Sequence, residues 1–349
     1  MNIETRALFV LAFLTISACG DAPDTKATAP EAATESAATP APLVVYSSRA
    51  EQLIAPIFAG FTEDTGIDVE YVTDSPQPLI ARLTAEGEQT PASVLLTVDA
   101  GNLWYAAEQD VLQPLQSSVL DEVVPAYLRD GASRWFGLSL RARTIVYDTR
   151  IVQPENLESY AALADPEWKG KLCLRTSKKV YNQSLVAMLI ATVGEAETES
   201  IVSGWVDNLA TDPFSNDTKL IEAIADGRCA VGIVNTYYLG RLQRENDLPV
   251  GLYFPAAEVG GTHVNISGAG IVKHAANKAA AQQLLEWLVS DRGQALFANE
   301  NLEFPVRNDI ENAPIVAAWG EYSPSEVPLE NAGKLQAKAV QLMDRVGYR

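Results

Sequence analysis

The sequence predicts an α/β protein with two lobes, and three observations lead to this fold class. Short runs rich in β-branched residues alternate with longer segments of helical periodicity, which is typical of helices layered on a largely parallel sheet. About 308 residues follow residue 41, enough for two lobes with substantial cores. Two long extended runs, 138–147 and 263–272, flank the middle of the chain. We expect them to cross between lobe one (42–140 and 267–349) and lobe two (141–266).

The individual elements follow from the apolar pattern, taken in chain order. The predicted strands are Leu43–Tyr46, Asp68–Val72, Ser93–Thr97, Leu138–Tyr147, Leu172–Arg175, Ala230–Val234 and Ile266–Val272. The predicted helices are Ala50–Phe61, Gln77–Glu86, Trp104–Gln109, Gln183–Val193, Leu220–Ala225, Ala279–Val289 and Leu335–Arg345. Pro56 conflicts with the first helix, so we expect a kink or a late start there. The final helix could pack on either lobe.

The N-terminal residues indicate export. Arg6 precedes an apolar run, 7–14, that is too short to span a bilayer in the mature protein. Small residues precede Cys19, which resembles a bacterial lipoprotein signal at 1–18 with Cys19 as the lipidated new N-terminus. An ordinary cleavable signal and a chance cysteine are the alternatives. Residues 19–41 contain almost no large apolar side chains and are expected to form a flexible tether. The expected location is therefore the periplasm, with a lipid anchor to a membrane.

The remaining cysteines are interpreted from this compartment. With Cys19 assigned to lipid, Cys173 and Cys229 form an even pair in an oxidising environment. Each belongs to a strand-like segment and lies eight residues before a tyrosine. We expect a disulfide between them, and two buried free thiols are the alternative.

Charge and motifs narrow the class of function. The net charge is −19 and the pI about 4.5, which argues against nucleic acid or an anionic membrane surface as a partner and is compatible with a cation ligand. The sequence shows no Gly-x-Ser-x-Gly elbow, no paired-His metal motif and no cysteine nucleophile with a base. Of the two histidines, His263 is expected to be structural and His274 to lie on the surface. The chain is therefore predicted to be a binding protein and not an enzyme.

A tyrosine pair is the strongest candidate for a site. Asn235 and Thr236 provide N-cap chemistry directly after an apolar strand, so Tyr237 and Tyr238 fall in the first turn of a helix. There they lie about 100° apart and can converge on one point, at a helix end that favours negative charge. Phenolates at neutral pH require a hard Lewis acid, and ferric iron fits. The alternatives are aromatics stacking on an organic ligand, such as a polyamine or thiamine, and half-buried core tyrosines.

Three strand-to-helix junctions carry the polar residues, at 46–51, 175–182 and 235–238. In open α/β sheets ligands bind beyond the carboxyl ends of strands, where helix N-termini point at them. The hydroxyls at the first two junctions could be simple caps. Three junctions that together supply tyrosines, hydroxyls and an arginine nevertheless favour one shared site.

Several segments resemble a known family. They are Val45–Ile54, Val98–Trp104, Val180–Leu185, Asn235–Leu239 and Gly261–Gly268. In content, order and spacing they are similar to the ferric-iron solute-binding proteins of bacterial ABC importers, over roughly residues 43–345. The resemblance implies a two-lobe periplasmic-binding-protein fold of the transferrin-like cluster with crossover hinge strands. It also implies a monomer that closes on Fe(III) and delivers it to the inner-membrane ABC permease of an iron importer.

The resemblance also implies the metal ligands, with departures. Tyr237 and Tyr238 match the family's paired tyrosine ligands, and Tyr181 matches the additional tyrosine of its multi-tyrosine members. Some relatives have a histidine where this chain has Ala50, or a tyrosine where it has Glu51. Lobe one therefore lacks a firm metal ligand in this pattern.

An anion is expected to complete the iron site. Arg49 beside the hydroxyls of Ser47 and Ser48, at a helix N-terminus, is a suitable clamp for an oxyanion, and the resemblance implies that this anion is carbonate. Glu51 as a direct metal ligand is the alternative, and so is a surface Arg49 that pairs with Glu51 or Asp74. Separately, two arginines on the run 138–147 are expected to pair with acidic neighbours near the hinge. These are Arg141 and Arg143.

Overall fold

The computed structural model describes residues 42–349. The predicted signal peptide 1–18, the predicted lipidation at Cys19 and the whole of the predicted tether to residue 41 lie outside the described residues. The strands are β1 (Leu43–Ser47), β2 (Val69–Thr73), β3 (Val94–Val98), β4 (Phe136–Asp148), β5 (Leu172–Cys173), β6 (Val231–Asn235), β7 (Val250–Tyr253), β8 (Val264–Ile271) and β9 (Phe304–Pro305). The helices are α1 (Glu51–Thr65), α2 (Pro76–Glu86), α3 (Ala100–Glu108), α4 (Ser118–Val123), α5 (Val180–Val193), α6 (Glu195–Asp207), α7 (Asp217–Ala225), α8 (Thr236–Glu245), α9 (Lys278–Leu288), α10 (Asp291–Asn301), α11 (Pro314–Ala317), α12 (Glu330–Lys334) and α13 (Gln336–Arg345).

The strands are joined in the order β2-β1-β3-β8-β4-β6-β5, with β7 and β9 added on β4. The pairs β1–β2, β1–β3 and β5–β6 are parallel, whereas β3–β8 and the pairs that β4 makes are antiparallel. The expectation of a largely parallel sheet is therefore wrong. Parallel pairing is confined to the outer strands of each lobe, because the two crossing strands run against their neighbours.

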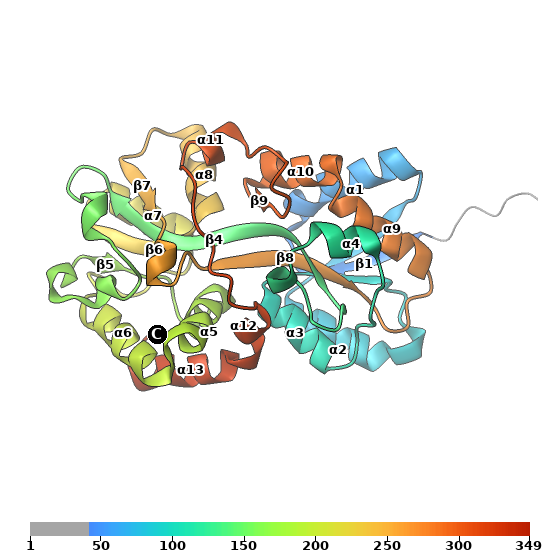
Figure 1. Cartoon of the computed structure of the whole chain (residues 1–349), viewed down its shortest axis with the longest axis horizontal. Coiled ribbons are helices and arrows are strands. Elements are labelled where there is room, and N and C mark those ends of the chain that lie inside the picture. Colours follow the sequence, from blue (N-terminus) through green and yellow to red (C-terminus); the bar gives the residue numbers. More distant parts are fainter. Residues whose placement is uncertain (1–41) are drawn as a thin grey trace, which may run out of the picture. The chain divides into compact units, whose positions relative to one another are not determined.

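The long strand β4 joins the two lobes. Residues 136–142 of β4 pair with β8, and residues 143–148 pair with β6 and β7. Figure 1 shows β4 and β8 running side by side between a group that contains α1 to α4, α9 and α10 and a group that contains α5 to α8 and α13. The predicted crossover strands are confirmed. The exact lobe boundaries stay a prediction, because β4 pairs with strands of both lobes, whereas β8 pairs only with β3 and with residues 136–142 of β4.

Separate apolar cores fill the two lobes. One cluster of buried side chains occupies the first lobe and includes Phe61 and Trp135. In the second lobe one cluster lies under α5 and α6 and another lies under α7 and α8. Leu342 and Met343 of α13 belong to the cluster of α5 and α6. The last helix, whose place the sequence left open, thus packs on the second lobe.

Local rules explain several boundaries. Helix α1 begins at Glu51 and continues through Pro56, so a late start is wrong. Helix α3 begins at Ala100, earlier than predicted, because the Asp99 carboxylate caps it by accepting a hydrogen bond of 2.9 Å from the Gly101 N–H.

None of the helices within residues 42–349 is both long and apolar enough to cross a bilayer.

The predicted disulfide is confirmed. Cys173 at the end of β5 is bonded to Cys229, which lies two residues before β6, and their Cα atoms are 5.9 Å apart. Strands β5 and β6 also pair in parallel at Cys173 and Gly232. The bond therefore fastens the two strands that lead toward the tyrosine-bearing helices.

Candidate metal centre

The tyrosine pair lies where α8 begins, as predicted. Tyr237 and Tyr238 occupy its first turn, with ring centres 4.4 Å apart and planes inclined by 32°. Asn235 stands at the N-cap position, but its side chain makes no capping hydrogen bond. Its amide nitrogen instead lies 3.4 Å from the Tyr237 hydroxyl. Asn235 therefore orients a tyrosine instead of closing the helix end.

A third tyrosine joins the pair from another element. Tyr181 lies in the first turn of α5, and all three tyrosines line one cavity of about 330 Å³. Burial raises the pKa of Tyr237 well above its ordinary value, and the neighbouring Tyr181 and Tyr238 phenols raise it further, although Arg141 opposes them. A buried phenol of this kind becomes a phenolate only when a cation replaces its proton.

The structure brings some predicted first-lobe residues to this cavity and not others. Ser48 and Arg49 line it together with Ala50. Ser47 does not; it is fully buried, and its hydroxyl accepts a hydrogen bond of 3.2 Å from the Arg49 N–H. Glu51 is exposed at the start of α1 and is not among the lining residues. The Ser48 hydroxyl accepts from the Val98 N–H at 3.0 Å, so it ties the first junction to the end of β3.

Arg49 has a partner that the sequence did not suggest. Its Nη1 and Nη2 donate to the two carboxylate oxygens of Glu303 at 3.1 and 3.2 Å, and Nη1 also donates to the Ser267 hydroxyl. The Arg49 and Glu303 side chains are 1% and 5% exposed. The alternative of a surface Arg49 paired with Glu51 or Asp74 is therefore wrong. Glu303 lies 254 residues from Arg49, and no local pattern connects them.

Arg141 on β4 is buried beside the tyrosines. Its Cζ lies 5.2 Å from the ring centre of Tyr181, and its Nη1 and Nη2 have no hydrogen-bond partner within residues 42–349. Burial lowers the pKa of Arg141, but the Tyr181 and Tyr237 phenols and the nearby carboxylates raise it more. The expected pairing with an acidic neighbour is wrong for Arg141. It leaves a buried cation facing the cavity with free donors.

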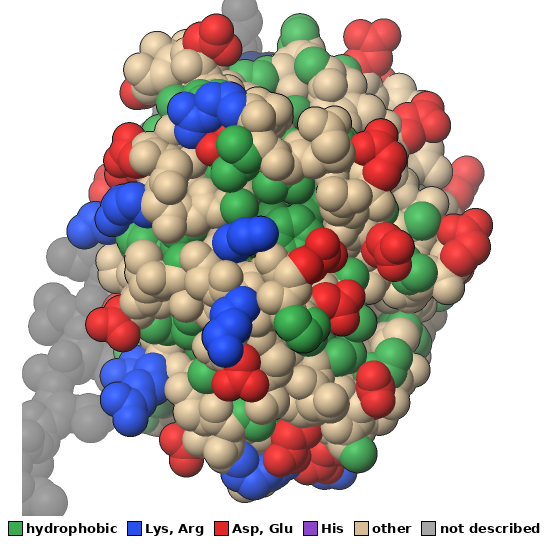
Figure 2. Space-filling model, turned by 90° about the vertical axis from the view of Figure 1, so that its left-hand side faces the viewer, with side chains coloured by type: hydrophobic (Ala, Val, Ile, Leu, Met, Phe, Trp, Pro, Cys, Tyr) green, Lys and Arg blue, Asp and Glu red, His purple; other side chains and the backbone are tan. Residues whose placement is uncertain are grey.

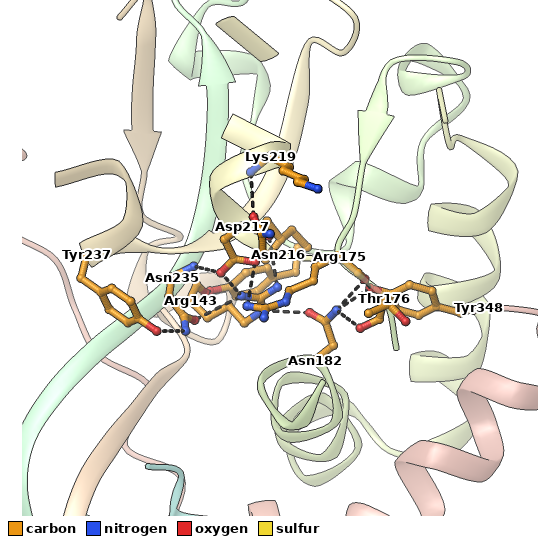
Figure 3. A network of polar contacts seen from close by, with 12 residues as sticks. Arg143, Arg175, Thr176, Asn182, Asn216, Asp217, Lys219, Asn235, Tyr237 and Tyr348 are labelled. Carbon is orange, nitrogen blue, oxygen red and sulfur yellow. Dashed lines mark hydrogen bonds and ion pairs between the residues drawn. The ribbon is translucent and has the colours of Figure 1, made fainter. Parts of the chain in front are cut away.

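The expected pairing is right for Arg143, two residues along β4. Arg143 Nη1 donates to the Asp217 carboxylate at 3.0 Å, and Arg143 Nε donates to the Asn182 side-chain oxygen at 2.9 Å. The same Asp217 oxygen accepts from the Asn235 N–H at 3.0 Å. Figure 3 shows this network, in which one buried carboxylate connects the segment of Tyr181 with that of Tyr237.

Arg175 extends the network toward the cavity. Its Nη1 lies 3.4 Å from Asp217, and its Cζ lies 5.3 Å from the ring centre of Tyr181 and 5.9 Å from that of Tyr238. On the other side, the Tyr348 hydroxyl donates to the Arg175 carbonyl at 2.5 Å. Tyr348, close after the last helix, thus fixes the loop that leads into α5 and its candidate ligand Tyr181.

Other metal-binding side chains do not gather in the described part of the chain. Residues 42–349 contain no group of three or more His, Cys, Asp or Glu side chains that could hold a metal ion. His263 is buried, and burial together with Arg143 and Arg141 lowers its pKa to about 3. Its backbone N–H donates to the Tyr160 hydroxyl at 3.0 Å, which agrees with a structural role. His274 is exposed, as expected.

One outer face of the second lobe carries charges of both signs. Figure 2 shows acidic side chains spread over this face, with Lys and Arg side chains between them. The cavity differs from the chain as a whole, because arginines line it beside the tyrosines although the net charge of the chain is −19.

The chain is similar to known binding proteins over most of its length. A family model described as "Bacterial extracellular solute-binding protein" matches residues 57–324. "Iron uptake protein A1" of Synechocystis sp. is 40% identical, over 100% of this chain and 97% of that protein. "Iron uptake protein A2" of the same organism is 40% identical, over 87% and 89% of the two chains.

Solved structures agree. A Trichodesmium protein (IdiA, FutA) "in complex with iron and citrate ligands" is 42% identical, with a TM-score of 0.84 over 88% of this chain and 99% of that one. The ferric binding protein of Campylobacter jejuni is 33% identical, with a TM-score of 0.81 over 88% and 100%. These matches confirm the two-lobe binding-protein fold and the prediction that the chain is not an enzyme. The chain belongs to the family of bacterial extracellular solute-binding proteins.

Proposed function

We propose that this protein is the ferric-iron receptor of a bacterial ABC importer, and that it binds Fe(III) through the phenolates of Tyr181, Tyr237 and Tyr238. The observation that carries the proposal is that three tyrosines from two helix N-termini line one cavity with buried guanidinium groups. Phenolates are hard donors, and three of them neutralise the charge of a ferric ion. The names of the relatives, which include iron uptake and ferric iron-binding proteins, support the same cargo.

The charges around the cavity support an accompanying anion. Glu303 neutralises Arg49, whereas Arg141 has free terminal nitrogens and Arg241 Nη2 is buried without a hydrogen-bond partner among the described residues. The Arg241 Cζ lies 4.8 Å from the ring centre of Tyr237. Positive charge therefore remains after three phenolates have balanced the iron. The anion is the predicted carbonate, and Arg141 is a better anchor for it than Arg49, since its donors are free.

A larger polycarboxylate is a second candidate for the anion. The cavity of about 330 Å³ has room for more than an iron ion and a carbonate. The Trichodesmium structure, to which this chain is similar, is described with iron and citrate ligands. A chelate such as ferric citrate would use the same phenolates and the same guanidinium groups.

The organic-cation alternative is less well supported. A polyamine or thiamine would bring positive charge next to Arg141 and Arg241, at the point where the cavity already has too few anionic partners. The remaining parts of the proposal are the periplasmic location, the lipid anchor at Cys19, the monomeric state and delivery to an inner-membrane permease. They rest on the resemblance and on family membership.

The visible spectrum of the purified protein tests the proposal, because iron–phenolate charge transfer absorbs visible light and stacked organic cations do not. Ferric iron added in the presence of bicarbonate should produce a coloured complex. The triple variant Tyr181→Phe, Tyr237→Phe, Tyr238→Phe should be colourless, whereas the control Tyr105→Phe, at an exposed tyrosine outside the cavity, should keep the band. Full colour in the triple variant would show that the ligands are elsewhere.

A further inference from the structure

We propose that Glu303 is a built-in replacement for a co-bound anion. Its carboxylate fills the guanidinium fork of Arg49, so that the first lobe meets the iron with its anion already in place. The inference rests on the proposed function. Among the described residues that line the cavity, it concerns the one that carries a carboxylate. On this view the charge of Arg49 is already balanced by Glu303, and a free anion binds at Arg141 instead.

The geometry of the pair is that of an anion clamp. Two parallel N–H···O bonds of 3.1 and 3.2 Å join Nη1 and Nη2 of Arg49 to the two oxygens of Glu303. A guanidinium holds carbonate or any other planar oxyanion with this same fork. A free anion could use the fork of Arg49 only after displacing Glu303. The carbonate site that the sequence suggested at Arg49 is thus taken by a side chain.

The fold holds Glu303 there from both sides. Helix α10 ends at Asn301, and its C-cap residue Leu302 is buried in the left-handed conformation (φ 56°, ψ 35°), which reverses the chain just before Glu303. Directly after Glu303, the two residues of β9 pair with β4 at Leu140 and Ser139. The Ser139 hydroxyl donates to the same carboxylate at 2.5 Å. Glu303 is only 4% exposed, so its position is set by the fold and not by solvent.

A tethered carboxylate changes how many anions accompany the iron. An exogenous anion must be taken from solution, and the apparent affinity for iron then depends on its concentration. A side chain fixed against its partner has no such dependence, because its effective concentration is set by the fold. Replacing Glu303 by a small residue should therefore free Arg49 and create a dependence on one more anion.

Linkage between iron and bicarbonate tests this. The apparent affinity for ferric iron is measured by competition with a chelator at several bicarbonate concentrations, and the slope of the double-logarithmic plot gives the number of anions taken up with the iron. Glu303→Ala should have a slope larger than that of the parent protein by about one, so a tenfold rise in bicarbonate strengthens binding by an additional factor of about ten. Glu300→Gln, an exposed carboxylate three residues earlier, is the matched control and should keep the parent slope.

The double variant Arg49→Ala, Glu303→Ala should return to the parent slope, because the freed fork is gone. An unchanged slope in folded Glu303→Ala would overturn the inference, and so would a raised slope that persists in the double variant. If Glu303→Ala does not fold, Glu303→Ser, which keeps a small acceptor beside Arg49, is titrated in its place with the same two outcomes.

An iron-free measurement separates this inference from the proposed function. Formate, a free carboxylate, should raise the melting temperature of iron-free Glu303→Ala clearly more than that of the parent protein, and this extra shift should vanish in the double variant. Equal shifts in all three proteins would overturn the inference. A parent protein that binds no ferric iron would refute the proposed function and leave the formate comparison as the test of the Arg49–Glu303 pair.

Discussion

The tyrosine site predicts how strongly iron binding depends on pH. A phenol in water titrates near pH 10, so forming one phenolate at pH 7 costs about 4 kcal/mol before any metal bond is made. For Tyr237 the cost is larger, because burial and the neighbouring phenols raise its pKa. Each phenolate ligand therefore releases one proton when iron binds near neutral pH. Three ligands should release about three, apart from any proton that the anion adds.

The sign and size of the effect follow from linkage. Because protons leave on binding, the affinity for iron rises with pH, and with three protons it should rise about 10³-fold per pH unit, or about 4 kcal/mol. Tyr237→Phe removes one phenol but keeps its ring, so the number of released protons should fall by about one. The anion's own contribution cancels in this comparison, because it is the same in parent and variant.

The assay is proton release in weakly buffered solution when a ferric chelate of known proton stoichiometry is added to iron-free protein. The parent and the Tyr237→Phe and Tyr181→Phe variants are compared over pH 5.5–7.5, roughly the range in which free phenols stay protonated. Tyr105→Phe should release as many protons as the parent. If parent and both cavity variants released equal numbers of protons, phenolate ligation by these tyrosines would be refuted.

Three further predictions concern the supporting structure. Asp217→Asn removes the charge opposite buried Arg143 and should lower the free energy of unfolding by about 3–5 kcal/mol in urea titrations, and an unchanged midpoint would contradict the network of Figure 3. Burial raises the pKa of Asp99 to about 6, so the protonated carboxyl stabilises the fold below about pH 4, and this contribution is lost as the pH rises through 6. Between pH 4 and pH 7 the free energy of unfolding of Asp99→Asn should therefore rise relative to that of the parent by up to about 3 kcal/mol. A difference between the two proteins that does not change with pH would contradict this. The double variant Cys173→Ala, Cys229→Ala should lose at most about 4 kcal/mol of stability, the chain-entropy value for a loop of 56 residues, while keeping its iron colour; loss of colour in a folded variant would give the bond a direct role at the site.

Elements with a strong local pattern were predictable from the sequence. The run before Asn235 and the start of the helix after it are predicted within one residue, because a short apolar run followed by helix-starting residues has few other solutions. Strand direction was not predictable, since an apolar run looks the same whether its neighbour is parallel or antiparallel. The helices α6 and α10 were missed because they are rich in polar residues and each contains a glycine, Gly204 or Gly293, that weakens the helical pattern.

The site likewise contains residues that can be predicted from local sequence and residues that cannot. The tyrosines were found because their positions at two helix starts can be read locally. Glu303 was missed because its pairing with Arg49 depends on a two-residue strand, β9, and on its register with β4. Likewise nothing in the alternation along β4 shows that Arg143 meets a carboxylate and Arg141 does not. Contacts between residues more than 200 positions apart follow from tertiary packing, and one sequence does not contain them in readable form.

The distribution of the proposed ligands between the lobes has an optical consequence. All three tyrosines belong to helices of the second lobe, so the proposed iron–phenolate complex would be coloured without a ligand from the first lobe. Trp319, in contrast, packs against β9 at Phe304, and its indole N–H donates to Gln243 of α8 at 3.1 Å. Absorbance therefore reports that the cargo is bound. The chain has six tryptophans, so the signal of this indole is the difference in emission between the parent and Trp319→Phe, and that difference reports whether α8 rests against Trp319. Recorded together in one stopped-flow trace, the two signals would separate capture of the ion from engagement of the lobes.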